Sequence, residues 1–236
     1  MRTFVLSALF FLGVVTAAIF IAPVIFARSF LRRQRSFHPS GTVCLAEVQP
    51  FVGAVPRLEG AARVRLSSAT APENAPDASI LGMAIKMENQ DLPLATFEAF
   101  LKTRAAIAHT NVADYLGNQY ASVTPWRAQE LGVVWLRAMP EPAHVTQGAR
   151  VERLEAAVAV QRAAFVLEAR QAPGPHAAVR ARLATLRLTQ VLREDDPAFK
   201  ISMFRTASGL APTGFRNGIR AVVYPVSQLA RRLRGG

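Results

Sequence analysis

The chain has 236 residues, with 28 Lys and Arg against 16 Asp and Glu, which gives a formal net charge of +12. A hydrophobic content of 51% excludes a disordered chain, and the length allows one domain plus an appendage, or two small domains. A single cysteine, Cys44, excludes an internal disulfide and a thiolate metal cluster, and no two of the four histidines stand at metal-ligand spacing.

The N-terminal segment is apolar and long enough to cross a bilayer. Residues 3–27 contain no charged side chain over 25 residues, and about 20 apolar residues suffice to span a membrane. A secretory signal has a shorter apolar core of about 7–15 residues and an A-x-A-like cleavage site, and no good site stands around Pro23. We therefore predict a transmembrane anchor over residues 1–27 and one soluble domain over residues 28–236, with a cleaved signal peptide as the alternative.

Cations on the two sides of this segment set its expected orientation. Arg2 and the amino terminus precede it, whereas the cations that follow it are Arg28, Arg32, Arg33 and Arg35. The side richer in Lys and Arg faces the cytoplasm. A single-pass anchor then places the soluble domain in the cytoplasm, and a cleaved signal peptide would place it in the periplasm.

The soluble part mixes strand and helix patterns. Strands are expected at residues 42–48, 62–67, 80–87 and 132–139, where residues alternate or run apolar. Residues 70–79 have loop composition, and helices are expected at 97–108 and at 220–234, the second interrupted by Pro225. Residues 151–170 mix both signals, and residues 177–192 fit either element. The pattern predicts an α+β fold, an antiparallel sheet or barrel with peripheral helices.

Five short strings follow one another in a fixed order along the soluble part. They are RSFHPSGTVC from Arg35, VRLSSA from Val64, PDASILGMAIKM from Pro76, YLGNQYASVTPWR from Tyr115 and APTGFRNGIRAVVYPVSQLARR from Ala211. Together they resemble the catalase-like haem proteins, especially the short, minimal members of the peroxidase type. No single string is specific, but their order and spacing over residues 38–232 are. The resemblance implies a trimmed antiparallel β-barrel that binds haem b.

Tyr224 stands in the last of these strings, and the resemblance implies that its phenolate oxygen is the axial ligand of the haem iron. A free phenol has a pKa of about 10, so the iron and a nearby cation must stabilise the phenolate. Arg220 stands four residues earlier, which places it on the same helix face. Without the resemblance, a tyrosine beside an arginine on a helix would carry no functional meaning.

Three further arginines match positions in the same strings: Arg35, Arg65 and Arg231. Because a planar guanidinium forms paired hydrogen bonds with a carboxylate, the resemblance implies that they bind the haem propionates. In a chain this rich in arginine, each of them fits a solvated surface position equally well. Arg35 also has a second role open to it, as a flank of the membrane anchor.

His38 is implied to lie on the opposite face of the haem from Tyr224. A neutral imidazole there can take a proton from a bound peroxide and return it to the leaving oxygen. Ser67 matches the family serine that hydrogen-bonds the second ring nitrogen and fixes the tautomer. Outside this context, a histidine followed by a proline would be an ordinary loop residue.

One part of the full catalase pattern is missing. Full catalases carry a distal Asn in a G-N-N-T-P string, whereas Asn89 here stands too early and Ala95 or Thr96 falls at the site. Val226 and Ser227 likewise replace the Asp and Thr that follow the ligand. We therefore expect a haem peroxidase with weak catalase activity at most.

Two functions of different kinds remain open. The favoured one is a membrane-anchored peroxidase that reduces hydrogen peroxide or organic and lipid hydroperoxides, and its alternative is a non-catalytic haem-binding membrane protein of the same fold. A third hypothesis without haem assigns the arginines to anionic lipid or nucleic acid. Basic residues are scattered without interleaved aromatics, so no nucleic-acid partner is expected, and only residues 28–35 form a cluster suited to lipid headgroups. A homo-oligomer is left open.

Overall fold

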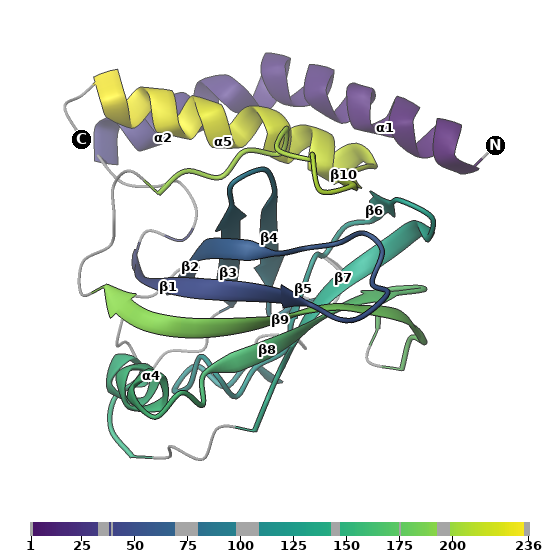
Figure 1. The fold of residues 1–236 in the computed structure, drawn as a ribbon. Coiled ribbons are helices and arrows are strands. Elements are labelled where there is room, and N and C mark those ends of the chain that lie inside the picture. Colours follow the sequence, from purple (N-terminus) through teal and green to yellow (C-terminus); the bar gives the residue numbers. More distant parts are fainter. Residues whose placement is uncertain are drawn as a thin grey trace.

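A layer of helices lies over one end of a β-barrel (Figure 1). The computed structural model describes residues 2–32, 38, 40–68, 80–97, 109–142, 147–174, 176–192 and 199–233. The helical layer is built from the first and last segments of the chain, because the N-terminal helix runs alongside the C-terminal one (Figure 1). The loop predicted at 70–79 falls outside the described residues, and so does the helix predicted at 97–108 except for its first residue.

Eight of the described strands close into an antiparallel barrel. Its neighbours follow the order β7, β5, β4, β3, β2, β1, β9, β8, and a pairing between β7 and β8 closes the ring. The bounds are β1 Ser40–Pro50, β2 Gly60–Ser68, β3 Leu81–Met87, β4 Asp91–Ala95, β5 Tyr120–Ala121, β7 Gly132–Pro140, β8 Ala164–Arg170 and β9 Val179–Leu192. The α+β barrel predicted from the sequence is therefore confirmed.

Two short strands and one helix complete the barrel layer. Strand β6 (Trp126–Ala128) pairs with β7, and β10 (Leu210–Pro212) pairs with β6. Helix α4 (Arg150–Ala159) precedes β8, so the mixed signal of residues 151–170 reflects a helix followed by a strand. Residues 177–192, which fitted either element, contain strand β9.

The barrel is held together by alternating side chains that fill its interior. In β1, for example, Ala46 and Val48 are buried while Glu47 and Gln49 are exposed. Each fully buried Val, Leu, Ile, Met or Phe side chain contributes about 1.5–3 kcal/mol to folding. The largest fully buried side chains are Trp126, Tyr115, Tyr120, Phe165, Leu58, Leu66, Leu81, Met83, Ile85, Leu92, Leu154 and Leu183.

The C-terminal helix, α5 (Phe215–Leu233), is longer than expected. It begins five residues before the predicted start at 220 and continues through Pro225, so the predicted interruption is wrong. A proline inside a helix removes one backbone hydrogen bond and crowds the preceding turn. Here the proline side chain is exposed, and the buried residues of α5 on either side of it keep the helix packed.

The N-terminal helix is continuous from α1 (Arg2–Thr16) through a π-helical turn, η1 (Ala17–Ile21), to α2 (Ala22–Arg32). Gly13, Ala17, Ile25 and Ser29 are buried, at spacings that are multiples of four. An α-helix of 3.6 residues per turn would rotate such a stripe steadily away from its partner. The wider turn of η1 takes up an extra residue, which keeps these positions facing α5.

Candidate functional site

A row of small residues crosses the barrel end that carries His38. Direct antiparallel pairing joins Gly41 to Ser67, Ser67 to Gly82, Gly82 to Ala95, and Ala95 to Ala121. Directly opposite residues of an antiparallel sheet project their side chains to the same face. None of the five is larger than serine, and all five are buried.

His38 lies at one end of this row, just before β1. Its backbone is left-handed, with φ 55°, and Arg65 holds it there by donating from Nη2 to the His38 carbonyl at 3.1 Å. Such a backbone is uncommon outside glycine and usually costs about 1–3 kcal/mol. The imidazole lies against Gly82, where an added Cβ would stand 2.6 Å from the ring Cε1. Arg65 and Gly82 therefore fix the position of the ring.

Ser67 sets which nitrogen of the His38 ring is the base. Its Oγ lies 3.1 Å from Nδ1 and also donates to the Gly82 carbonyl at 3.4 Å. A hydroxyl has one proton to donate, so with that proton on the carbonyl, Ser67 accepts from an Nδ1–H group. The neutral ring then carries its lone pair on Nε2, the nitrogen that can take a proton.

The electrostatic surroundings keep His38 neutral. Burial first, and then the charges of Arg65 and Arg220, lower the pKa of His38 from 6.5 to about 4. A neutral imidazole is the form that can act as a general base. Arg220 belongs to α5, so the charge of this helix contributes to the lowered pKa of His38.

Helix α5 is fastened to the segment that follows β5. Arg220 donates from Nη1 to the Ser122 carbonyl at 3.2 Å, and Thr124 Oγ1 donates to Asn217 Oδ1 at 2.8 Å. Asn217 is fully buried and also donates from Nδ2 to the Pro125 carbonyl at 3.0 Å. These bonds set the rotation of the helix about its axis.

Tyr224 lies one turn beyond Arg220, is half-buried, and packs against the hydrophobic core of the barrel. The side chains of Arg220 and Tyr224 therefore lie on the same face of α5, and that face packs against the barrel. Arg231, two turns further along, is also half-buried. The predicted phenol belongs to α5, and the predicted imidazole stands two residues before β1.

The candidate residues suit a haem in their chemistry. A phenol such as that of Tyr224 can bind ferric iron, and a neutral imidazole such as that of His38 can act as a base. Of the predicted carboxylate partners, Arg231 is half-buried on α5 and Arg65 donates to the His38 carbonyl. Arg35, the third predicted carboxylate partner, lies outside the described residues. Within the described part of the chain, no three His, Cys, Asp or Glu side chains gather as a metal site.

Sequence reasoning missed the residues that hold the others in place. Gly82, Ser122, Thr124 and Asn217 stand in the matched strings, but only the fold shows that they contact His38 or α5. Ala95, one of the two residues expected where full catalases carry an Asn, pairs with Gly82 beside the imidazole. Neither residue of this pair carries an amide side chain.

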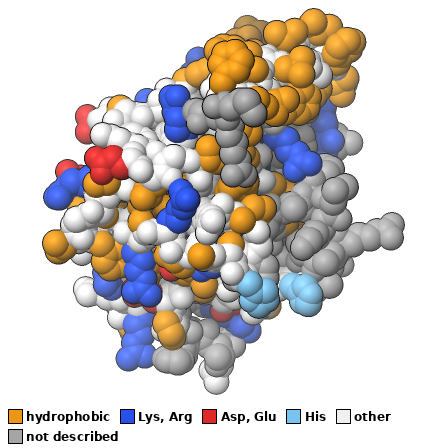
Figure 2. Space-filling model, turned by 90° about the vertical axis from the view of Figure 1, so that its right-hand side faces the viewer, with side chains coloured by type: hydrophobic (Ala, Val, Ile, Leu, Met, Phe, Trp, Pro, Cys, Tyr) orange, Lys and Arg blue, Asp and Glu red, His pale blue; other side chains and the backbone are white. Residues whose placement is uncertain are grey.

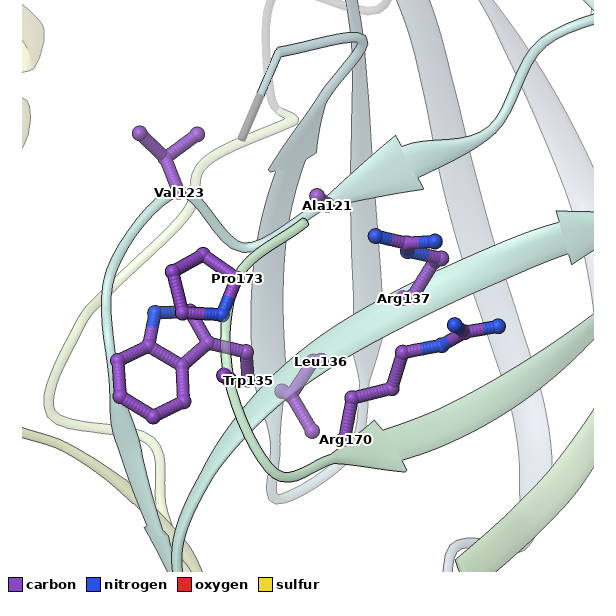
Figure 3. A pocket seen from close by; sticks show the side chains of 8 residues that line it. Ala121, Val123, Trp135, Leu136, Arg137, Arg170 and Pro173 are labelled. Carbon is purple, nitrogen blue, oxygen red and sulfur yellow. The ribbon is translucent and has the colours of Figure 1, made fainter. Parts of the chain in front are cut away.

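A second cluster of buried charge lies on the side of the barrel (Figure 3). Arg137 donates to Gln119 Oε1 at 3.2 Å and to the Gly174 carbonyl at 2.8 Å, and Arg170 pairs with Glu168 at 2.7 Å. Burial, and then the charge of Arg170, lower the pKa of Arg137 to about 10. The cavity between them is about 10 Å³, room for one water at most. This cluster is structural.

Comparisons with known proteins support the fold. No protein-family model matches the chain, and no curated protein sequence matches it. Among solved structures, the chain is similar to catalase A from Saccharomyces cerevisiae, with a TM-score of 0.55 and 9% sequence identity. The likeness covers 87% of this chain but 63% of the yeast chain. The barrel is therefore catalase-like in fold, in a chain that spans less than two thirds of its structural neighbour.

Proposed function

We propose that the protein is a haem-dependent peroxidase that reduces hydrogen peroxide or organic and lipid hydroperoxides. The observation that most supports this proposal is His38, kept neutral by its surroundings and held beside Ser67 and Gly82, in a catalase-like barrel whose helix α5 carries Arg220 and Tyr224. Haem b, when bound, would supply the redox chemistry. Tyr224 would ligate its iron, with Arg220 as the nearest cation on the same helix.

The protein's own residues would manage the proton. Reduction of R–O–O–H consumes two electrons and two protons and gives R–O–H and water; an organic donor supplies the electrons. His38 Nε2 would take the proton of the hydroperoxide and deliver it to the departing oxygen. Ser67 would keep Nδ1 protonated, and Arg65 would hold the backbone that aims the ring. With Ala95 in place of the distal amide, we expect dismutation of hydrogen peroxide to be slow.

The full chain in detergent tests the cofactor directly. We expect haem to give an absorption band typical of high-spin iron bound to a phenolate, and Tyr224→Phe to abolish that band. Tyr120→Phe is the matched control, because it removes another buried phenol, one that donates to the Tyr115 carbonyl at 2.8 Å away from α5. Unchanged haem binding in Tyr224→Phe would contradict the proposed ligand.

A non-catalytic haem-binding protein is the second candidate. It is favoured by Ala95 at the distal position and by Arg220, whose guanidinium is bonded to the Ser122 carbonyl. The rate of peroxide reduction decides between the two. For an enzyme, His38→Ala should lower kcat/KM by about 10²–10⁴-fold with the haem retained, whereas equal rates favour the second candidate.

The same proposal includes a lipid bilayer as partner. The helix from Phe4 to Leu31, 28 residues, is long and apolar enough to cross a membrane by length and composition. It would keep the barrel near lipid hydroperoxides. The sequence favours a single-pass anchor with the barrel in the cytoplasm, and no nucleic-acid partner is proposed.

A further inference from the structure

The N-terminal helix presents an apolar outer face along its whole length. Four of its largest side chains are 68–78% exposed: Phe4, Phe11, Phe20 and Leu31. Leu229 and Leu233 extend this face onto the end of α5. Figure 2 shows hydrophobic side chains gathered at the edge of the molecule that the helical layer forms, with Lys and Arg side chains beside them.

The opposite face of this helix is fastened to α5 from end to end. Near its start, the Gly214 amide donates to the Leu6 carbonyl at 3.0 Å, and near its end Ser29 Oγ lies 2.8 Å from Ser227 Oγ in a buried contact. The two contacts are 23 residues apart, about 35 Å of helix. The N-terminal helix therefore lies parallel to α5 over most of its length.

Glycines bring the two helices together between these points. An added Cβ on Gly13 would collide with the Phe215 carbonyl and would stand 3.2 Å from Gly218 Cα. An added Cβ on Gly218 would collide with the Phe10 carbonyl in turn. Contact between backbones at paired glycines is typical of tightly associated helices, so this helix is part of the domain.

A helix in this position cannot span a bilayer unless α5 enters the membrane with it. The polar side chains of α5 include Arg216, Asn217, Arg220, Gln228, Arg231 and Arg232. Each arginine at the bilayer centre costs at least about 2.5–3.5 kcal/mol. Helix α5 is also tied to the barrel through Asn217, and through Gln228 Nε2, which donates to the Ile201 carbonyl at 3.0 Å.

The charges around the apolar face match an anionic lipid surface. Neither the N-terminal helix nor α5 contains an Asp or Glu. Arg28, Arg216 and Arg232 are exposed on these helices. Each basic residue near an anionic membrane surface contributes about 1 kcal/mol to binding. A helix with an apolar face and basic borders binds in the plane of the interface.

We propose that the helical layer docks in the plane of an anionic bilayer, with the outer face of the N-terminal helix in the lipid and α5 held at the membrane surface. The inference rests on the bilayer partner proposed above and is independent of the haem. It replaces the spanning anchor with an interfacial one, and it puts the helix of Tyr224 at the lipid surface. A lipid hydroperoxide would then reach the site from the membrane side.

Nitroxide labels test the depth of the helix in the full chain. Phe4→Cys, Phe11→Cys, Phe20→Cys and Leu31→Cys are labelled one at a time and bound to vesicles of equal parts phosphatidylglycerol and phosphatidylcholine. Cys44 does not compete for the label, because it is buried and burial raises its pKa to about 12. Collision rates with oxygen and with a water-soluble nickel complex then give the depth of each label.

An in-plane helix keeps all four labels within the shallow interfacial layer of one leaflet. A spanning helix would place the Phe11 and Phe20 labels deep and the two end labels at opposite surfaces, which would overturn the proposal. If the labels do not contact lipid and the protein forms a stable dimer in solution, the membrane proposal is wrong, and a second copy of the chain covers the apolar face instead. The haem absorption band of each variant is recorded in parallel, so failure of the proposed cofactor is seen separately.

Binding to the same vesicles supplies a second readout. Phe11→Glu with Phe20→Glu should weaken vesicle binding at least roughly tenfold, because two apolar contacts with lipid are lost. Val52→Glu is the matched control, since Val52 is fully exposed in the turn after β1, away from the helices. Equal loss in both, or no loss in the double variant, would contradict the docking face.

Discussion

Two groups of arginines, one in the barrel wall and one around His38, have different surroundings. Around Arg137 and Arg170, the guanidinium groups meet Glu168 or backbone carbonyls, and the space between them is no larger than a water molecule. Around His38, Arg65 and Arg220 flank an imidazole, and among the described residues no carboxylate is a cause of its pKa shift. We expect the first cluster to contribute to stability and the second to keep His38 neutral.

The largest effect should come from removing the compensation in the first cluster. Glu168→Gln leaves the buried Arg170 without its carboxylate, and breaking a buried pair in this way costs about 3–5 kcal/mol of unfolding free energy. We expect a lower Tm in thermal unfolding, while the folded fraction keeps its haem band. Arg182→Gln is the control, because Arg182 is exposed and lies 4.0 Å from Glu168. A comparable loss in both variants would contradict this assignment.

A pH titration should reveal the second cluster. Because the folded pKa of His38 is about 4 and the unfolded value is 6.5, the unfolded chain binds the extra proton first as the pH falls. Stability is therefore full above pH 6.5 and falls by up to about 3 kcal/mol between pH 6.5 and pH 4. His38→Gln should flatten this part of the profile of unfolding free energy against pH. Arg220→Gln should raise the pKa of His38, and an unshifted profile would show that α5 does not face the histidine.

A smaller effect should follow from filling the space beside the imidazole. Gly82→Ala adds a Cβ that would stand 2.6 Å from Cε1 of His38, so the ring must move away from Ser67. Overpacking of this kind costs about 1–3 kcal/mol, and the rate of peroxide reduction should fall more than haem binding does. Ala61→Ser is the control for a small change in the sheet, because Ala61 is exposed on the neighbouring strand β2, six residues from Ser67. A wild-type rate in Gly82→Ala would show that the ring is not fixed by this contact.

The local sequence predicted much of the barrel, because alternation of apolar and polar residues within a strand reports which face is buried. Strands β1, β2, β3 and β7 were expected close to where they lie. Strand β9 was ambiguous, since its Arg-rich pattern fits a helix face as well as an edge of a sheet. Helix α5 was expected to break at Pro225, because propensity ignores the packing that holds the helix on both sides of the proline.

The sequence by itself determined the apolar N-terminal helix, the alternation that builds the barrel, and the strings that name His38, Ser67, Arg220 and Tyr224 as candidates. Only the tertiary structure decided that Gly41, Ser67, Gly82, Ala95 and Ala121 form one row, and that the N-terminal helix lies along α5. The physical reason is the separation in sequence of the residues involved. Burial patterns can be recognised from neighbouring residues, whereas strand register and helix contacts depend on partners that are up to about 200 residues apart in the chain.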